Sequence, residues 1–214
     1  MSMDLSSQRR EYDHPPIADD AMLADPFGQF ERWYQDAVRA QLLEPNAMVL
    51  ATVDPKGRPA QRTVLLKYFD RKGFMFFTNY ASRKSIHIGD NAHVSILFQW
   101  LPLQRQIEIN GKAERVPTAE SLKYFATRPR GSQLGAWVSE QSQVITSRSL
   151  LEAKLAEMKA KFLNREVPLP SFWGGFNVVP ERFEFWQGQP SRLHDRFEYR
   201  LETECEWTHS RLAP

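Results

Sequence analysis

Apolar residues along the chain repeat with two different periods, and these periods predict where helices and strands lie. A helix is favoured after Asp25-Pro26, because apolar residues recur there at helical spacing: Phe27, Phe30, Trp33, Tyr34 and Val38. Short apolar or alternating runs typical of strands begin at Ala47. They cover residues 48–53, 61–69, 74–78, 94–100, 105–116, 176–179, 183–186, about 191–199, and 207–212.

Four further segments favour helices. Ser82 is a plausible N-cap for a short helix, and Thr118 for a helix that runs to about Thr127. Residues 133–138 favour a short buried helix, and the capping-box pattern at 149–152 opens an amphipathic one. We expect this last helix only to pack, through the stripe Leu151, Leu155, Met158 and Phe162.

The many short strands with a few helices between and beside them predict a mainly β fold with flanking helices (α+β). Strands that follow one another closely in sequence favour an antiparallel barrel over a parallel doubly wound sheet. The chain has 214 residues, 42% of them hydrophobic, which is enough for one substantial core. We expect one domain over 26–214, preceded by a mobile segment, 1–25, that is rich in Ser, Asp, Arg and Pro.

Charge and cysteine content narrow the function classes. The net charge of +2, from 28 basic and 26 acidic residues, argues against binding to nucleic acid or to a membrane surface. The single cysteine, Cys205, cannot form an internal disulfide, which fits a reducing, cytoplasmic environment. No apolar run is long enough for a transmembrane helix, and the polar start of the chain does not resemble a secretory signal.

A basic stretch near the C-terminus is the first candidate site. As a strand, residues 191–199 would place Arg192, His194 and Arg196 on one face. Like charges on one face repel unless an anion is present. Two interpretations stay open: a solvated strand face, or a binding face for an anionic, planar ligand with Trp186 as a stacking wall.

The predicted helix start after Ser82 is the second candidate. Arg83 and Lys84 fall in its first turn, where the helix dipole disfavours each cation by about 0.3–1 kcal/mol. A bound anion would reverse that penalty, so the segment is either a phosphate site or a solvated, frayed helix end.

Two more sets of polar residues are candidates, one around a helix end and one on an apolar strand. Tyr124, Arg128 and Ser132 lie within nine residues around a helix end and resemble a second phosphate cradle. Arg62 and Lys67 lie on opposite faces of an otherwise apolar strand, so each needs a partner or a path to water.

Common catalytic motifs are absent from the sequence. It contains no GxGxxG, no GxxxxGK and no GxSxG, and the five histidines have no zinc-ligand spacing, so no metal is expected. Gln106 is either a hydrogen-bonding group for a ligand edge or an ordinary surface residue.

Several segments, in their joint order and spacing, resemble the pyridoxine/pyridoxamine 5′-phosphate oxidase family. The resemblance runs from about residue 9 to the end of the chain. The segments that carry it are Arg62–Lys67, Thr78–Lys84, Arg105–Arg115, Tyr124–Ser142, Phe172–Phe176, Glu184–Gly188, Arg192–Arg196 and Arg211–Pro214.

The resemblance implies a fold, a cofactor and a reaction. It implies an antiparallel split β-barrel that forms a homodimer, with FMN bound between the subunits. It implies oxidation of pyridoxamine or pyridoxine 5′-phosphate to pyridoxal 5′-phosphate, with dioxygen as acceptor and hydrogen peroxide as product. The amine substrate would also release ammonia.

The resemblance also assigns roles to matching residues. The FMN phosphate group would be held by Arg62, Arg83, Lys84 and Ser142, with Phe77, Thr78 and Gln141 beside it and with the rest of the segment Thr63, Val64, Leu65, Leu66 and Lys67. The flavin ring and ribityl chain would contact Gln106, Trp186 and Arg196. The substrate phosphate would be held by Lys67, Tyr124, Arg128 and Ser132.

The catalytic residues implied are Arg192 and His194, which together with Leu193 would cover the substrate ring. They would orient the amine or hydroxyl, and one of them would take its proton. The segment Arg9, Arg10, Glu11 and Tyr12 would fold over the substrate.

Two other functions remain open at this point. One is a related split-barrel flavin reductase that uses a nicotinamide donor, and the other is a non-catalytic carrier of flavin or pyridoxal phosphate. A phosphate cradle for the substrate argues against a reductase with a neutral substrate, and peroxide release would exclude a carrier.

Overall fold

The computed structural model describes residues 2–139, 141–203 and 206–214. Cys205, on which the expectation of a reducing environment rests, and Glu140 of the predicted polar loop lie outside the described residues. The chain divides into two compact units: unit 1 is Met1–Val49, Ser95–Asn110 and Pro180–Pro214, and unit 2 is Leu50–Val94 and Gly111–Val179. The prediction of a mobile segment before a single domain stays a prediction.

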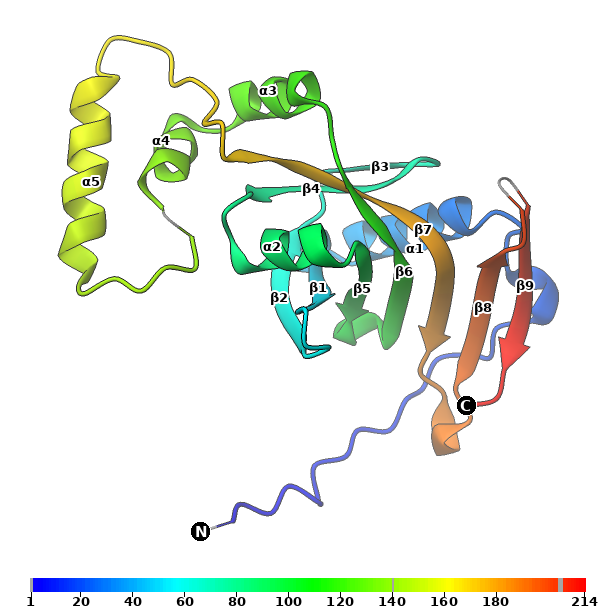
Figure 1. The fold of residues 1–214 in the computed structure, drawn as a ribbon. Coiled ribbons are helices and arrows are strands. Elements are labelled where there is room, and N and C mark those ends of the chain that lie inside the picture. The colour runs from blue at the N-terminus through cyan, green and yellow to red at the C-terminus, as the bar shows by residue number, and fades with distance from the viewer. Residues whose placement is uncertain (1, 140, 204–205) are drawn as a thin grey trace. The chain divides into compact units, whose positions relative to one another are not determined.

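Figure 1 shows the helices and strands of the chain. The α-helices are α1 (Pro26–Arg39), α2 (Arg83–Asp90), α3 (Thr118–Thr127), α4 (Arg130–Val138) and α5 (Arg148–Lys161). The strands are β1 (Ala47–Val53), β2 (Pro59–Leu65), β3 (Tyr68–Asp70), β4 (Gly73–Asn79), β5 (His93–Trp100), β6 (Arg105–Arg115), β7 (Trp173–Gln187), β8 (Asp195–Leu201) and β9 (Trp207–Leu212). Short 3-10 turns lie at Asp19–Ala21, Leu101–Leu103 and Pro190–Arg192.

The strands form a sheet in the order β2-β1-β5-β6-β7-β4-β3, with β8 on β7 and β9 on β8. The pairs β3–β4, β4–β7, β7–β8 and β8–β9 are antiparallel, as the sequence predicts. No helix in the described part of the chain is long and apolar enough to cross a membrane.

Two strand predictions were wrong in their boundaries. The predicted strand 61–69 is interrupted after Leu65, and β3 starts at Tyr68, although the backbone N–H of Lys67 still bonds the Met75 carbonyl at 2.8 Å. Conversely, the two strands predicted at 176–179 and 183–186 are one strand, β7, which continues through Pro180. Local periodicity does not detect either feature, because pairing with the neighbouring strand decides where a strand continues.

The basic strand face predicted at 191–199 was also wrong. Pro190 begins a 3-10 turn, and Ser191 and Arg192 have positive φ angles of 56° and 63°. Strand β8 begins only at Asp195, and Leu193, expected to face the core, is 69% exposed. Arg192, His194 and Arg196 therefore do not share a strand face.

Helix starts were predicted with mixed success. Asp25 caps α1 as expected, since its side chain accepts the N–H of Phe27 at 3.2 Å. Pro117, not Thr118, occupies the N-cap position of α3. The capping box at 149–152 was wrong: Ser147 is at the N-cap of α5, and Ser149 already lies inside the helix.

The boundaries of one other helix and the face of α1 also differ from expectation. Helix α4 begins at Arg130 rather than at residue 133, so Ser132 lies in its first turn. On α1 the core position is Ala37, whereas Val38 is 44% exposed.

Unit 1 has an aromatic core between α1 and the strands β7 and β8. Phe27 of α1 packs edge-on against Phe183, with ring centroids 5.3 Å apart, and Trp33 packs against Phe185 at the same distance. Tyr199 of β8 is fully buried, and its hydroxyl donates to the Leu23 carbonyl. This core anchors the segment of β7 that leads to Trp186.

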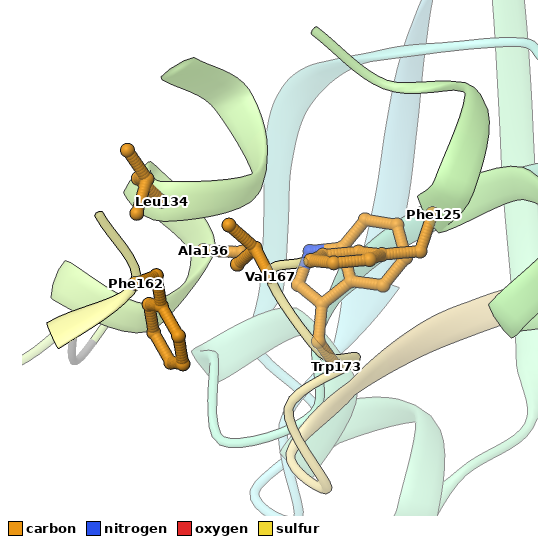
Figure 2. Close-up of a cluster of buried hydrophobic side chains, with 6 residues drawn as sticks. All are labelled: Phe125, Leu134, Ala136, Phe162, Val167 and Trp173. Carbon is orange, nitrogen blue, oxygen red and sulfur yellow. The ribbon is translucent and has the colours of Figure 1, made fainter. Parts of the chain in front are cut away.

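Unit 2 has its own hydrophobic cluster, drawn in Figure 2. It joins helices α3 and α4 to the segment that precedes β7 and consists of Phe125, Leu134, Ala136, Phe162, Val167 and Trp173. From the predicted stripe of α5, Leu155 and Met158 pack against the cluster and are partly buried. The cluster fixes α3 and α4 beside β4 and so forms one wall of a cavity.

Candidate functional site

Unit 2 contains a cavity of about 1050 Å³. Strands β2 and β4, the start of α2, the junction of α3 and α4, and the segment around Gln141 contribute to its walls. The predicted site residues among its lining are Arg62, Thr63, Val64, Leu65, Lys67, Phe77, Thr78, Arg83, Lys84, Tyr124, Arg128, Ser132, Gln141 and Ser142. The structure thus gathers residues that are up to 80 positions apart in sequence.

Lys84 is a buried cation with only neutral partners among its hydrogen-bond acceptors. Its Nζ donates to the hydroxyls of Thr78 and Ser82 at 3.1 Å each and to Oε1 of Gln141 at 3.2 Å. Lys84 is only 9% exposed. Burial, and then the charge of Arg62, lower the pKa of Lys84 to about 8.

Arg62 and Arg83 add positive charge to the same end of the cavity. Arg62 donates through Nη1 to the Leu50 carbonyl at 3.0 Å and to the Thr52 hydroxyl at 2.7 Å. Burial, and then the charge of Arg83, lower the pKa of Arg62. Both shifts mean that these cations lack compensating negative charge.

The N-terminus of α2 lines the cavity with its first two residues, Arg83 and Lys84. Ser82 is at the N-cap position, as predicted, but its hydroxyl bonds Ser85 Oγ and Lys84 instead of a backbone N–H. The Arg83 N–H donates to Oγ of Ser142 at 3.2 Å, and Ser142 has a φ of 74°, which non-glycine residues rarely adopt. Strained backbone of this kind is frequent at binding sites.

A second group of polar residues lines the cavity around Arg128. Its guanidinium carbon lies 4.7 Å from the centroid of Trp173, and its buried Nη1 has no hydrogen-bond partner. Tyr124 stacks on Phe77 with centroids 4.1 Å apart. Burial lowers the pKa of Arg128 and raises that of Tyr124. An unsatisfied, buried guanidinium N–H is costly without an acceptor, so this group fits an anion.

The cavity therefore carries cations at two places: Lys84 with Arg62 and Arg83, and Arg128 with Tyr124 beside it. None of its described lining residues has a carboxylate. Donors of this kind favour phosphate groups over neutral ligands.

Some lining residues were not predicted from the sequence. Asn79 is buried, with its Nδ2 donating to the Ser139 carbonyl at 3.0 Å, and Trp173 forms the wall behind Arg128. No local pattern marks them, because only the tertiary fold brings them to the cavity. Leu66, in contrast, was predicted to contact the cofactor but is buried and does not line the cavity.

The remaining predicted site residues belong to unit 1: Arg9, Arg10, Glu11, Tyr12, Gln106, Trp186, Arg192, Leu193, His194 and Arg196. Three of them form an aromatic group. The ring of His194 lies 4.7 Å from Trp186 and 5.6 Å from Tyr12, centroid to centroid, and Tyr12 packs edge-on against Trp186. Gly188 permits this, because a Cβ there would lie 2.8 Å from the Tyr12 ring.

Arg196 lies directly opposite Trp186 in the β7–β8 ladder. Its Nε donates to Glu184 at 2.8 Å, and its Nη1 donates to the Ala213 carbonyl at 2.8 Å. Arg192 is exposed, and Gln106 is half-buried on β6. Unit 1 thus brings Tyr12, Trp186 and His194 together, and holds Arg196 on the next strand.

The sequence matches known families over most of its length. Residues 34–162 match the family described as pyridoxamine 5′-phosphate oxidase, and residues 173–214 match the pyridoxine 5′-phosphate oxidase C-terminal dimerisation region. Each match covers predicted site residues. The chain belongs to the pyridoxine/pyridoxamine 5′-phosphate oxidase family.

Relatives in this oxidase family are similar over their full length. The chain is 61% identical to the pyridoxine/pyridoxamine 5′-phosphate oxidase of Crocosphaera subtropica and 58% identical to that of Rippkaea orientalis, in each case over 99% of this chain and 100% of the relative. A third, from Escherichia fergusonii, is 54% identical over 98% of this chain and 96% of its own length.

Solved structures confirm the predicted split-barrel fold of the oxidase family. PhzG from Burkholderia lata, solved with tetrahydrophenazine-1-carboxylic acid, superposes with a TM-score of 0.86 at 30% identity, over 91% of this chain and 95% of that chain. An FMN-binding, pyridoxamine 5′-phosphate oxidase-related protein from Nostoc punctiforme has a TM-score of 0.72 at 16% identity, over 89% and 98%, and so supports the fold alone. The C-terminal dimerisation region supports a homodimer.

Proposed function

We propose that this chain is an FMN-dependent oxidase that converts pyridoxamine 5′-phosphate and pyridoxine 5′-phosphate to pyridoxal 5′-phosphate. Dioxygen is the electron acceptor, hydrogen peroxide is released, and the amine substrate also yields ammonia. The observation that carries the proposal is the cavity that holds Lys84, Arg62 and Arg83 together with the buried, partnerless guanidinium nitrogen of Arg128, since FMN and each substrate bear one phosphate. The names of the full-length relatives agree with it.

FMN fits the group of cations around Lys84. Lys84, Arg62 and Arg83 would pair with its phosphate, which the N-terminal end of the α2 dipole also favours. The lowered pKa values of Lys84 and Arg62 would return toward ordinary values in the presence of this dianion. When bound, FMN supplies the redox chemistry, because no protein side chain accepts a hydride.

The substrate phosphate fits the second group. The partnerless Nη1 of Arg128 offers a buried donor, and Tyr124, Ser132 and Lys67 line the same cavity. These contacts to the phosphate would hold the substrate in one orientation. They would thereby fix the position of its reactive carbon, although they lie at a distance from that carbon.

We place FMN at the interface of the homodimer, where Gln106, Trp186 and Arg196 contact its ring and ribityl chain. The dimerisation region covers residues 173–214 and so includes Trp186 and Arg196. This supports a contact between that region and the cofactor. Arg192 and His194 would orient the amine or hydroxyl of the substrate, and residues 9–12 would cover it. The cytoplasmic location stays a prediction.

Product stoichiometry tests this function. Purified protein loaded with FMN, given pyridoxamine 5′-phosphate in air, should form pyridoxal 5′-phosphate and hydrogen peroxide in equal amounts. Bound flavin that is reduced by a nicotinamide donor and not by the amine would instead favour a reductase, and protein that binds both ligands without forming peroxide would favour a carrier.

A further inference from the structure

The segment between β7 and β8 folds back so that a backbone amide reaches an imidazole ring. The N–H of Gln189 donates to Nδ1 of His194 at 3.1 Å. A backbone N–H can only donate, so Nδ1 must be the unprotonated nitrogen that accepts. The neutral ring then carries its hydrogen on Nε2.

Gln189 is held firmly in the position from which it donates. Its side-chain Nε2 bonds Oδ2 of Asp195 at 2.8 Å and the Pro15 carbonyl at 3.0 Å. Gln189 is 3% exposed and Asp195 is 5% exposed. The Asp195 carboxylate also accepts the Ile17 N–H at 2.9 Å and pairs with Arg211. The hydrogen bond to His194 is therefore part of a buried network.

The surroundings of His194 favour the neutral ring. Trp186 of β7 and Tyr12 of the N-terminal segment pack on it, and neither carries charge at neutral pH. Arg192 is a charged neighbour, and Glu11 of the N-terminal segment accepts the Ser191 N–H at 3.2 Å. Burial, and then the charge of Arg192, lower the pKa of His194.

We propose that His194 serves the reaction as a neutral hydrogen-bond donor through Nε2–H and not as the proton acceptor, and that Gln189 and Asp195 are positioning residues that fix this tautomer. The role toward the substrate rests on the proposed function. Protonation at Nδ1 would break the bond to Gln189 and bring two N–H groups face to face. Guanidinium groups do not act as proton acceptors in proteins, so Arg192 is not the acceptor either. The substrate ammonium group therefore gives its proton to water, and the neutral amine is the form that loses hydride.

The tautomer is measured directly by NMR. In FMN-loaded protein labelled with ¹⁵N-histidine, the His194 signals are identified by their loss in His194→Asn. Long-range ¹H–¹⁵N correlations at pH 7.5 should show hydrogen on Nε2, and the titration midpoint should lie below the ordinary value of about 6.5. Gln189→Ala keeps the backbone N–H but removes the side-chain bonds to Asp195 and Pro15 that hold it in place. This variant should therefore show a mixture of tautomers. Hydrogen on Nδ1 in the wild type, or a cationic ring, would overturn the proposal.

Two substitutions test the role in turnover. Glutamine can place an N–H near the position of Nε2, whereas asparagine replaces only the Nδ1 side of the ring. Flavin reduction by pyridoxamine 5′-phosphate should be about 10- to 100-fold slower in His194→Asn than in His194→Gln. Between pH 7 and 9, where the His194 ring is neutral, flavin reduction in His194→Gln should depend on pH as in the wild type, because water takes the amine proton in both. A steeper pH dependence in His194→Gln than in the wild type would make His194 the acceptor. Wild-type flavin that the amine does not reduce would refute the proposed function, while the NMR result would still decide the tautomer.

Discussion

Lys84 is the residue at which stability and binding conflict most clearly. Its ammonium group is buried, its described acceptors are three neutral oxygens, and Arg62 lies close enough to lower its pKa further. Such a cation destabilises the protein until an anion binds, and residues of this type are retained for binding.

Replacing Lys84 should separate these two effects. Lys84→Met removes a poorly solvated charge, so the FMN-free protein should melt at a higher temperature. The same change removes a phosphate partner, so FMN should bind about 10- to 100-fold more weakly. Thermal unfolding and quenching of flavin fluorescence measure the two effects. Lys159→Met, on the exposed side of α5, is the control, and unchanged FMN affinity in Lys84→Met would contradict the phosphate site.

The lowered pKa of Lys84 also predicts how FMN binding depends on pH. The free protein has a pKa of about 8 at Lys84, and a phosphate dianion beside it must raise that value. Binding therefore takes up a proton above pH 8, and affinity should fall by up to about tenfold per pH unit there. Fluorescence titrations from pH 7 to 10 test this, and the fall should be smaller in Lys84→Met. Equal slopes in both proteins would refute the role of Lys84.

At the scale of elements, the β7–β8 pair holds Arg196 through an ion-pair network. Glu184 of β7 binds Nε of Arg196 at 2.8 Å and Nη2 of Arg182 at 2.7 Å. Arg182 also pairs with Glu108 at 2.9 Å and with Glu198. Interactions with the carboxylates raise the pKa of Arg182 against the effect of burial. Glu184 thus connects Arg196, the proposed flavin contact, to Arg182 of β7.

Glu184→Gln should weaken this link. The amide cannot neutralise two guanidinium groups, so we expect a loss of about 1–3 kcal/mol in the free energy of unfolding. Urea unfolding measures it, with Glu157→Gln on exposed α5 as the matched control. A loss no larger than that of the control would show that the network is a surface feature only.

The N-terminal segment contacts the same unit through Tyr12, which packs where Gly188 leaves room. In Gly188→Ala the new Cβ would lie 2.8 Å from the Tyr12 ring and displace it. If residues 9–12 cover the substrate, KM for pyridoxamine 5′-phosphate should rise severalfold while FMN affinity stays the same. Gly89→Ala, where a Cβ meets nothing within 4 Å, is the control. An unchanged KM would contradict the covering role.

The sequence predicted elements well where one rule acts locally. Asp25 and the period of the aromatic residues were sufficient for α1, and a short apolar run was sufficient for β4. Prediction failed at 190–194, because a 3-10 turn with positive φ angles looks like an alternating strand in sequence. In the site, Arg83 and Lys84 were detected because two cations in a first turn conflict with the helix dipole. Asn79 and Trp173 give no such local conflict, so only the fold identifies them.

At the scale of the whole molecule, full-length similarity to the oxidase family and the two cation groups of unit 2 lead to the same function. The second group, around Arg128, distinguishes a phosphorylated substrate from a neutral one. The central claim is therefore that one cavity binds two phosphates and that the second phosphate positions the substrate.

The most direct measurement is anaerobic flavin reduction followed by stopped-flow absorbance, with pyridoxamine 5′-phosphate and with pyridoxamine. We predict that the phosphorylated amine bleaches the flavin bands at least about 10- to 100-fold faster at equal concentration, and that Arg128→Met removes most of this difference. Equal rates for the two amines, or a full preference for the phosphate ester in Arg128→Met, would contradict the account.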